Sequence, residues 1–360
     1  MPIPPDPGGL TASYLTTVLR DAGVLRSSVV TSAQVSVVPA GTGFAGQAAH
    51  VTLTYDRPEP DAPTRMFAKL STADPQVLAR LRPVGLFETE AGFYRELSGD
   101  CPQRVPRAFA SLYEPDSGMT LLLLEDLSTL RFGNNVEGAS PDDARAALVA
   151  LARMQAHYWN SPRLPQCGWL RSAVHDRVST PPLMRSLVPV FETRWSATAP
   201  ASVVAAVRAL AAHAETWIDG HLAGPRTLSH GDYRPDNMAF TSDGDTVLFD
   251  WQTARFDAGS RDVAYFLTYA LTVDARREHE AALLELYHET LVRSGVRDYT
   301  RADVQANHRR SVGTAVSRLL IAGATLDFSS ERGTLLARAL MARVAAAVDD
   351  HDFLGWIETM

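Results

Sequence analysis

The stretch Leu228–Phe240, LSHGDYRPDNMAF, decides the fold of this 360-residue chain. It follows a short apolar segment, but it has neither the three- to four-residue periodicity of a helix nor the alternation of a strand. Its glycine, proline, aspartate and asparagine are typical of turns, so an ordinary turn is one interpretation. The other is a loop that presents polar side chains, because His230, Asp232 and Asn237 follow one another at intervals of two and five residues.

A further acid downstream favours the second interpretation. The segment DTVLFDW places Asp250 at the end of a strand-like apolar run, thirteen residues after Asn237. A carboxylate at the end of a buried strand is poorly solvated, so a divalent cation is the expected compensation. The two segments together predict a functional site that contains a metal.

Two secondary-structure patterns follow one another along the chain. Residues 29–124 read as strands separated by turns, with one helix in GLFETEAGFYREL, where apolar residues recur at three- and four-residue spacing. After Leu124 the pattern is helical, and Ser140 and Pro141 open a helix in SPDDARAALVALARMQAHYW. Further helices are predicted at roughly 202–222, 260–272, 276–294, 301–323 and 330–349.

The N-terminal part contains a glycine-rich turn followed by a lysine. In GTGFAG, the glycines Gly41, Gly43 and Gly46 precede the alternating strand AAHVTLTY, which indicates a turn between antiparallel strands whose amides approach an anion. An ordinary glycine hairpin is the alternative. Lys69 lies inside the apolar run MFAKL, and Glu90 on the inward stripe of the helix is its natural partner. A snorkelling lysine and a solvated glutamate are the alternatives.

Composition excludes several classes of partner. The net charge of −7 and pI near 5.8 provide no basic field for a phosphate backbone, so we expect no nucleic acid partner. No apolar run is long enough to cross a bilayer, and the N-terminus MPIPPDPGGL lacks the features of a signal peptide, so we expect no membrane association and a cytoplasmic location. The two cysteines, Cys101 and Cys167, have no CxxC spacing, which argues against a disulfide framework or a structural zinc.

Five segments of the chain resemble one family. HGDYRPDN, VLFDWQ, LLLLEDL, GTGFAG…FAKL and TEAGFYREL are similar to the aminoglycoside phosphotransferase and choline-kinase-like superfamily, most closely its ecdysteroid-kinase-like branch. The resemblance implies a bilobal, protein-kinase-like α+β fold. Residues 1–124 would form a nucleotide-binding lobe with a small antiparallel sheet and one helix, 125–134 a hinge, and 135–360 a larger, mainly α-helical lobe with the catalytic loop and the acceptor site.

The resemblance also implies roles for individual residues. Asp232 would be the catalytic base, while Asn237 and Asp250 would bind Mg²⁺. Lys69, supported by Glu90, would contact the α- and β-phosphates, and all of these side chains would surround one triphosphate.

Further residues are expected to support these groups. The backbone from Glu125 to Leu127 would bind the purine, and His230 would support the catalytic loop. Asp262 would brace the loop through backbone amides, although a helix N-terminal cap is an equally good interpretation. Relatives commonly have a histidine in place of Gln155; we interpret the shifted His157 as a core histidine.

The implied activity is transfer of the γ-phosphoryl group of ATP or GTP, with Mg²⁺, to a hydroxyl of a small metabolite or antibiotic-like molecule. One alternative is a kinase that acts on Ser or Thr of a peptide in a natural-product pathway. Another is a non-catalytic nucleotide-binding scaffold, against which the retained Lys, Asp and Asn positions count. The sequence does not indicate an oligomeric state.

The acceptor is the least defined part of this prediction. Aromatic residues in the second lobe are candidates to line an apolar acceptor pocket, although such residues are more often core. They are Tyr158, Trp159, Trp169, Phe191, Trp195 and Tyr269. C-terminal acids are candidates to bind a cationic aminosugar, although a solvated acidic tail is the simpler interpretation. They are Asp349, Asp350, Asp352 and Glu358. We favour a neutral, partly apolar, hydroxylated metabolite.

Overall fold

The computed structural model describes residues 2–39, 46–72 and 74–360, and the chain divides into two compact units. The first unit comprises Met1–Arg131 and Leu248–Thr253, and the second comprises Phe132–Val247 and Ala254–Met360. The first contains an antiparallel sheet and the second is mainly helical, which confirms the predicted α+β class.

The first unit is built on a five-stranded sheet with the order β1-β2-β3-β5-β4, in which every neighbouring pair is antiparallel. The strands are β1 (Val30–Val37), β2 (Gln47–Tyr55), β3 (Arg65–Leu70), β4 (Ala108–Tyr113) and β5 (Thr120–Glu125). Alternation along β3 separates the two faces, because Met66, Ala68 and Leu70 join a buried apolar cluster while Lys69 lies on the opposite face.

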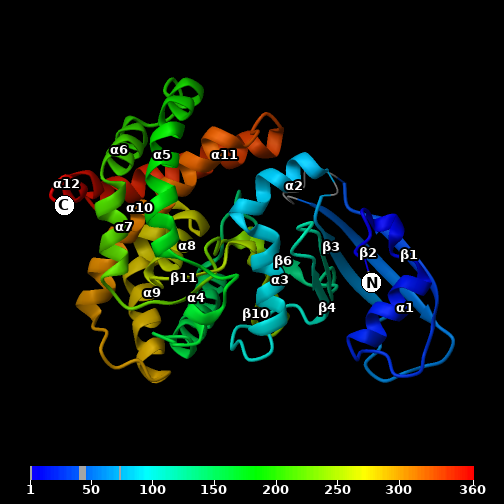
Figure 1. The fold of residues 1–360 in the computed structure, drawn as a ribbon. Coiled ribbons are helices and arrows are strands. Elements are labelled where there is room, and N and C mark those ends of the chain that lie inside the picture. The colour runs from blue at the N-terminus through cyan, green and yellow to red at the C-terminus, as the bar shows by residue number, and fades with distance from the viewer. Residues whose placement is uncertain (1, 40–45, 73) are drawn as a thin grey trace. The chain divides into compact units, whose positions relative to one another are not determined.

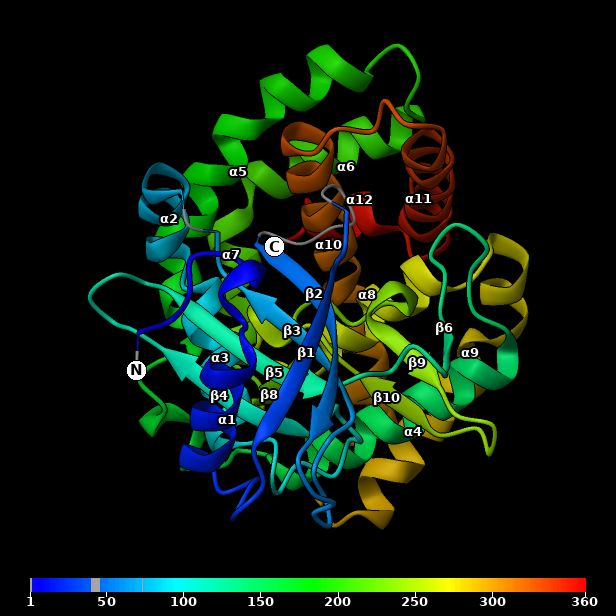
Figure 2. The same cartoon turned by 90° about the vertical axis from the view of Figure 1, so that its right-hand side faces the viewer.

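Helices cover both faces of this sheet (Figures 1 and 2). The helix α1 (Ala12–Asp21) adds Leu15, Val18 and Leu19 to the apolar cluster, whereas α3 (Leu86–Glu96) packs against β4 and β5. Lys69 pairs across the ladder with Leu122 of β5, so it belongs to the face that α3 covers. The sheet therefore turns Lys69 toward the helix that carries Glu90.

Two helices of this unit were not predicted, namely α1 and α2 (Pro75–Leu81). The side chain of Thr11 caps α1, and that of Asp74 caps α2. The residues before α1 are also packed, since Ile3 is buried and its amide donates to Glu114. The prediction of one helix was therefore incomplete.

The second unit contains nine helices among its described residues. They are α4 (Pro141–His157), α5 (Ala173–Trp195), α6 (Ala201–Ala212), α7 (Ala214–Leu222), α8 (Ser260–Ala270), α9 (Val273–Arg293), α10 (Arg301–Thr325), α11 (Glu331–Asp350) and α12 (Phe353–Ile357). The long helix α10 runs among the others and packs against α5, α6, α8 and α11 (Figure 1). Val312 and Leu320 of α10 lie in the apolar core that these helices share.

The helix α5 was missed because three prolines, Pro181, Pro182 and Pro189, lie inside it. Proline removes a backbone hydrogen-bond donor and is unfavourable inside a helix, so the sequence predicts no continuous helix here. Packing offsets that preference, since Met184 and Phe191 of α5 are fully buried in the core. The predicted helix at 202–222 is instead two helices, α6 and α7, which meet at His213.

Short strands complete the structure. They are β6 (Arg131–Phe132), β7 (Arg171–Ser172), β8 (Thr227–Ser229), β9 (Met238–Phe240), β10 (Thr246–Leu248) and β11 (Arg255–Asp257). In the second unit β8 and β9 flank the stretch from His230 to Asn237, which ends in the 3-10 turn Pro235–Asn237. Across the described residues we find no helix with the length and apolarity to span a membrane.

Candidate active site

The predicted site residues fall into two groups, one in each unit. Lys69, Glu90 and Asp250 meet in the first unit. The Lys69 ammonium donates to Glu90 Oε1 and Oε2 at 2.8 and 2.7 Å and to Asp250 Oδ1 at 2.7 Å. Burial opposes the charge of Lys69, but the carboxylates of Asp250 and Glu90 more than offset that effect. They raise the pKa of Lys69 above its usual value of 10.5. Lys69 and Glu90 are thus ion-paired, and neither of their alternative interpretations holds.

Asp250 owes its position to the short segment 248–253 that the first unit takes from later in the chain. Its φ of 65° lies in the left-handed region, which aspartate tolerates better than most residues. The next residue, Trp251, stacks on Phe93 of α3 with ring centroids 3.7 Å apart. This stacking attaches the segment to α3 beside Glu90 and directs Asp250 toward Lys69.

Of the predicted glycines, Gly41 and Gly43 lie outside the described residues, whereas Gly46 is described. Gly46 approaches β3 so closely that a Cβ atom there would lie 2.0 Å from the Leu70 carbonyl oxygen. It lines a small hollow together with Lys69, Glu90 and Gln252. The close approach gives a physical reason for glycine at this position.

The predicted hinge begins where β5 ends. The Glu125 amide donates to the Arg107 carbonyl at 2.8 Å, and the Leu127 carbonyl accepts from Leu130 at 2.9 Å. Residues 125–134 also include the boundary between the units, after Arg131. A purine-binding role for Glu125 and Leu127 stays a prediction.

In the second unit, Asp232 is buried among hydrogen-bond donors. Its Oδ1 accepts from the Tyr265 hydroxyl at 2.9 Å, and its Oδ2 accepts from Asn237 Nδ2 at 2.8 Å and from Arg234 Nε at 3.0 Å. Burial favours the neutral acid, but the guanidinium groups of Arg234 and Arg318 outweigh it and hold the pKa of Asp232 below its usual range. Asp232 is therefore an oriented, ionised carboxylate at neutral pH.

Asn237 is tied to the same carboxylate. Its Nδ2 donates both to Asp232 Oδ2 and to the Asp232 backbone oxygen, at 2.8 and 2.9 Å. The amide nitrogen is thereby directed at Asp232, which leaves Oδ1 as the oxygen of Asn237 suited to a metal. Amide and carboxylate oxygens are the donors that Mg²⁺ prefers, so Asn237 and Asp250 fit it chemically.

Asp262 binds the backbone of the loop. Its carboxylate accepts from the amides of His230 and Gly231 at 2.8 and 2.9 Å. The N-cap position of α8 is Gly259, so Asp262 is not the capping residue. His230 is fully buried, and its Nδ1 accepts from the Asp232 amide at 3.3 Å. Both side chains therefore fix the backbone on which Asp232 is carried.

Sequence reasoning missed Tyr265 and Arg318. Tyr265 lies one helical turn after Asp262 on α8, a spacing of three residues that puts both on one side of the helix and was available as a signal. Arg318 of α10 donates to the Gly231 carbonyl, and its separation of 87 residues gave no such signal. The two residues add a neutral donor and a cation to the environment of Asp232.

His157 corrects one expectation. It is exposed at the end of α4, so the interpretation as a core histidine is wrong. Gln155 is the buried residue: its Nε2 donates to the Gly259 carbonyl at 3.1 Å, and its Oε1 accepts from Tyr287 at 2.5 Å. An amide can donate and accept at once, which suits this position.

Most of the proposed acceptor-pocket aromatics are core residues. Tyr158, Trp169, Phe191 and Tyr269 are buried. Trp195 packs against the same core and donates to Gly323. Of the two interpretations, the core interpretation holds for these side chains, because packing inside the helical unit covers them.

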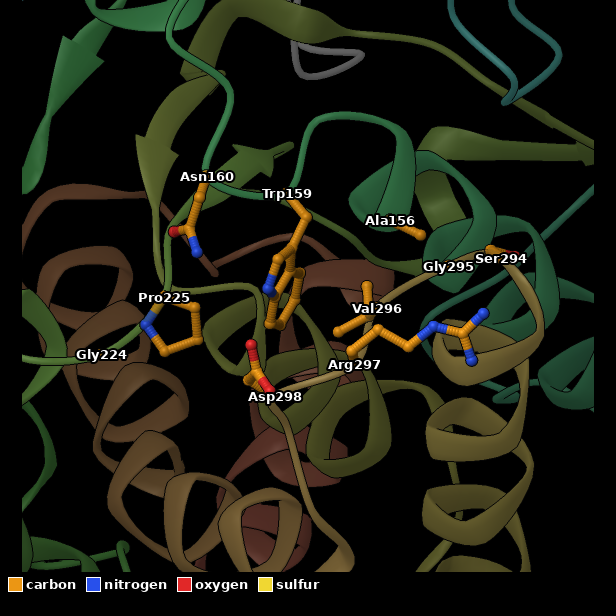
Figure 3. Close-up of a pocket in the computed structure, with 10 residues that line it drawn as sticks. All are labelled: Ala156, Trp159, Asn160, Gly224, Pro225, Ser294, Gly295, Val296, Arg297 and Asp298. Atoms are coloured by element: carbon orange, nitrogen blue, oxygen red, sulfur yellow. The ribbon is translucent and has the colours of Figure 1, made fainter.

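Trp159, the remaining candidate, lines a cavity of about 590 Å³. Figure 3 shows its ring pointing into this cavity between Pro225 and Val296, near Asp298. The lining residues come from the end of α4 and from the loops before β8 and before α10, and none of them is a predicted catalytic or metal-binding residue. Size alone does not make this cavity the acceptor site.

The C-terminal acids are partly neutralised. Asp350 pairs with Arg276 and Arg277, and Asp352 pairs with Arg309. Two of the four acids are therefore engaged by arginines, which weakens the case for a cationic aminosugar at this end of the chain.

Comparisons with known proteins identify the family of the chain. The model of the phosphotransferase enzyme family, APH, matches residues 59–304, more than half of the chain. That range contains the side chains predicted to act in catalysis and in phosphate and metal binding, from Lys69 to Asp262. No curated protein matches the chain.

Solved structures share the fold at low sequence identity. Choline kinase from Cryptosporidium parvum is 10% identical, with a TM-score of 0.58 and with 91% of this chain and 93% of that chain covered. An amicoumacin kinase in complex with AMP-PNP, Ca²⁺ and Ami is 11% identical, with a TM-score of 0.55 and coverage of 91% and 92%. The kinase-like fold is confirmed, as is the predicted superfamily, while the ecdysteroid-kinase-like branch stays a prediction.

Proposed function

Because the chain belongs to the phosphotransferase enzyme family, we propose that it transfers the γ-phosphoryl group of ATP or GTP to a hydroxyl of a small molecule. The observation that carries this proposal is the environment of Asp232. A base must be ionised and oriented before it can accept a proton, and Arg234, Asn237 and Tyr265 meet both requirements.

Asp232 is assigned to the acceptor hydroxyl. As the hydroxyl oxygen bonds to the γ-phosphorus, the bond from that phosphorus to the β–γ bridging oxygen breaks and the nucleoside diphosphate leaves. The hydroxyl proton passes to an Asp232 carboxylate oxygen and then to solvent. Asp262 and His230 act through the loop backbone, so they are positioning residues.

Lys69 is assigned to the nucleotide phosphates. Its ammonium is fixed by Glu90 and Asp250, so little conformational entropy is lost when it contacts an anion. Asn237 and Asp250 would hold Mg²⁺, which when bound neutralises charge on the phosphates. The absence of a side chain lets the backbone of Gly46 itself approach β3.

We propose a hydroxylated metabolite or antibiotic-like molecule as the acceptor. Choline kinase and amicoumacin kinase are named for small molecules of these kinds, so such compounds come first in an acceptor screen. Release of ADP or GDP above the basal rate identifies an acceptor.

The decisive variant is Asp232→Asn, which keeps the side-chain volume but removes the base. Loss of general-base catalysis is expected to slow ADP release by about 10²- to 10⁴-fold. Affinity for AMP-PNP with Mg²⁺, measured by calorimetry, should stay close to that of the unaltered protein, because the nucleotide contacts are assigned to other residues. Basal ADP release serves as the assay until an acceptor is found.

Asp236→Asn is the matched control. Asp236 lies in the same loop and also bonds Arg234, at 3.1 Å, but Asn237 and Tyr265 bond Asp232 instead. The control should keep most of the activity. Equal activity of Asp232→Asn and the unaltered protein would show that Asp232 is not the base.

A further inference from the structure

A second group of possible ligands lies in the helical unit, apart from the residues assigned to phosphoryl transfer. It consists of Glu280 of α9, His308 of α10 and His351, the residue after α11. Both histidines direct Nε2 at the Glu280 carboxylate: His308 lies 3.0 Å from Oε1, and His351 lies 3.2 Å from Oε1 and 3.1 Å from Oε2. We propose that these three side chains bind a divalent transition-metal ion, with Zn²⁺ the best match.

The ligand chemistry supports zinc. Two imidazoles and one carboxylate form a common protein set for an exchangeable or catalytic zinc, in which a fourth position is left to water. Imidazole nitrogen also favours zinc and its neighbours in the transition series over Mg²⁺ and Ca²⁺, which prefer oxygen ligands. The proposed ion therefore differs in class from the one assigned to Asn237 and Asp250.

The spacing supports it as well. One candidate atom from each residue lies within 4.8 Å of the others, and the nitrogen-to-oxygen distances are 3.0–3.2 Å. Bonds of about 2.0–2.1 Å in a tetrahedral arrangement place neighbouring ligand atoms about 3.3 Å apart. Small adjustments of the side chains would therefore admit the ion, and no helix needs to move.

The three proposed ligands are largely buried, and a cavity beside them gives a metal ion access. His308 is only 3% exposed, whereas the side chains of Glu280 and His351 are 14% and 19% exposed. Glu280 and His351 line a cavity of about 230 Å³, together with Glu285 and His288. The cavity supplies a route for the ion and space for the water at the fourth position.

Arg276 shapes the same cluster. Its Nη1 donates to Glu280 Oε2 at 2.9 Å and lies 3.4 Å from His351 Nε2, while its Nη2 binds Asp350. The first bond helps to hold the Glu280 carboxylate beside both histidines, as an outer partner of a metal ligand does. Its positive charge also opposes a cation, so the site should bind more weakly than a zinc finger does.

The experiment measures metal content and affinity in the full-length protein without a polyhistidine tag. We expect one zinc per chain after dialysis against Zn²⁺ and gel filtration, and a one-site isotherm on titration with ZnCl₂. Since outer-sphere changes weaken metal binding by about 10- to 100-fold, loss of a direct ligand in His351→Gln or Glu280→Gln should weaken it by more than about 100-fold.

His279→Gln is the matched control, because His279 precedes Glu280 on α9 and is not one of the three ligands. Its zinc content and affinity should be unchanged. His351 lies at the end of a helix and is partly exposed, so His351→Gln should fold even where the buried His308→Gln does not. Circular dichroism verifies folding, and the visible absorption of bound Co²⁺ gives a readout that does not depend on kinase activity.

The proposal is overturned if the unaltered protein binds no stoichiometric zinc. It is equally overturned if folded His351→Gln and Glu280→Gln bind zinc as tightly as the control does. In either case the cluster is a hydrogen-bond network of Arg276, Glu280 and the two histidines.

Discussion

Lys69 in the first unit and Asp232 in the second are both buried charges, but they are stabilised in opposite ways. Lys69 is a cation between two carboxylates, with three contacts of 2.7–2.8 Å. Asp232 is an anion that accepts from one guanidinium, one amide and one hydroxyl. The group around Lys69 has an excess of negative charge. Around Asp232, by contrast, the carboxylate is stabilised by neutral donors as well as by the Arg234 guanidinium.

The difference shows how each region suits its proposed role. Two anions around one cation can accept a divalent ion, since the added charge reduces an existing imbalance. The Asp232 carboxylate stays ionised because the Arg234 guanidinium lowers its pKa, and the neutral donors Asn237 and Tyr265 fix its orientation. Lys69 and its partners thus suit metal and phosphate binding, and Asp232 suits proton transfer.

We expect the largest effect from Lys69→Met, which keeps approximately the length of the side chain but removes its charge. Glu90 and Asp250 would then face each other without their cation. Breaking a buried ion pair from one side typically costs about 3–5 kcal/mol, so the free energy of unfolding in urea should fall by that order. Binding of AMP-PNP should also be lost.

Two variants check the cause. Glu90→Gln leaves Lys69 paired with Asp250, so it should destabilise the protein less than Lys69→Met does. Adding Glu90→Gln and Asp250→Asn to Lys69→Met removes the uncompensated anions and should restore part of the stability. If the triple variant is no more stable than Lys69→Met, charge imbalance is not the reason for the loss.

A smaller effect is expected from Tyr265→Phe, which removes one neutral donor from Asp232 and keeps the ring. A hydrogen bond to a charged group contributes about 1.5–3 kcal/mol, and part of it should appear in the rate, as a decrease of about tenfold in kcat for ADP release. Nucleotide affinity should not change, which separates a positioning role from a general loss of structure.

Tyr269→Phe is the control for this variant. The two rings are 4.4 Å apart on α8, but the Tyr269 hydroxyl donates to the Ala315 carbonyl, at 3.3 Å, and not to Asp232. Its kcat should match that of the unaltered protein. Equal losses in both variants would mean that Tyr265 acts only through packing.

The smallest effect concerns pH. Arg234 and Arg318 lower the pKa of Asp232 below its usual 3.8, so the base stays ionised and protonation of Asp232 should not reduce kcat between about pH 8 and about pH 5. In Arg234→Gln the pKa of Asp232 should rise, because one of the two guanidinium groups that lower it is removed, and the acidic limb of the pH profile should shift to higher pH. A profile that is identical in both proteins would contradict the role of Arg234.

The directions of the pKa shifts also determine how the free energy of unfolding depends on pH. The folded pKa of Asp232 is depressed, so its contribution is present above pH 3.8 and is lost as the pH falls through the lower folded value. The folded pKa of Lys69 is raised, so its contribution is complete below pH 10.5 and is lost only at higher pH. Neither group should make unfolding depend on pH near neutrality.

The sequence predicted the parts of the site that depend on spacing within one segment. His230, Asp232 and Asn237 share one loop, and the apolar run before Asp250 and the stripe that carries Glu90 are local patterns. Such patterns survive folding because backbone geometry fixes them. The succession of strands and then helices followed from the same local periodicities.

Features that depend on packing between distant segments were missed. The helix α5 contains three prolines, and its side chains Met184 and Phe191 pack in a core formed with other helices. Most of the candidate acceptor aromatics are core residues, and nothing in their own segments indicates what covers them. Glu280, His308 and His351 lie on different elements, and only the packing of α9, α10 and α11 brings them together.

The stacking of Trp251 on Phe93 has a practical consequence. Trp251 is the only one of the six tryptophans that belongs to the first unit, and it is adjacent in sequence to Asp250. Indole emission responds to nearby charge, so ligand capture beside Asp250 should alter the fluorescence of this one residue. With the other five tryptophans changed to phenylalanine, the chain would carry its own optical probe for nucleotide titrations.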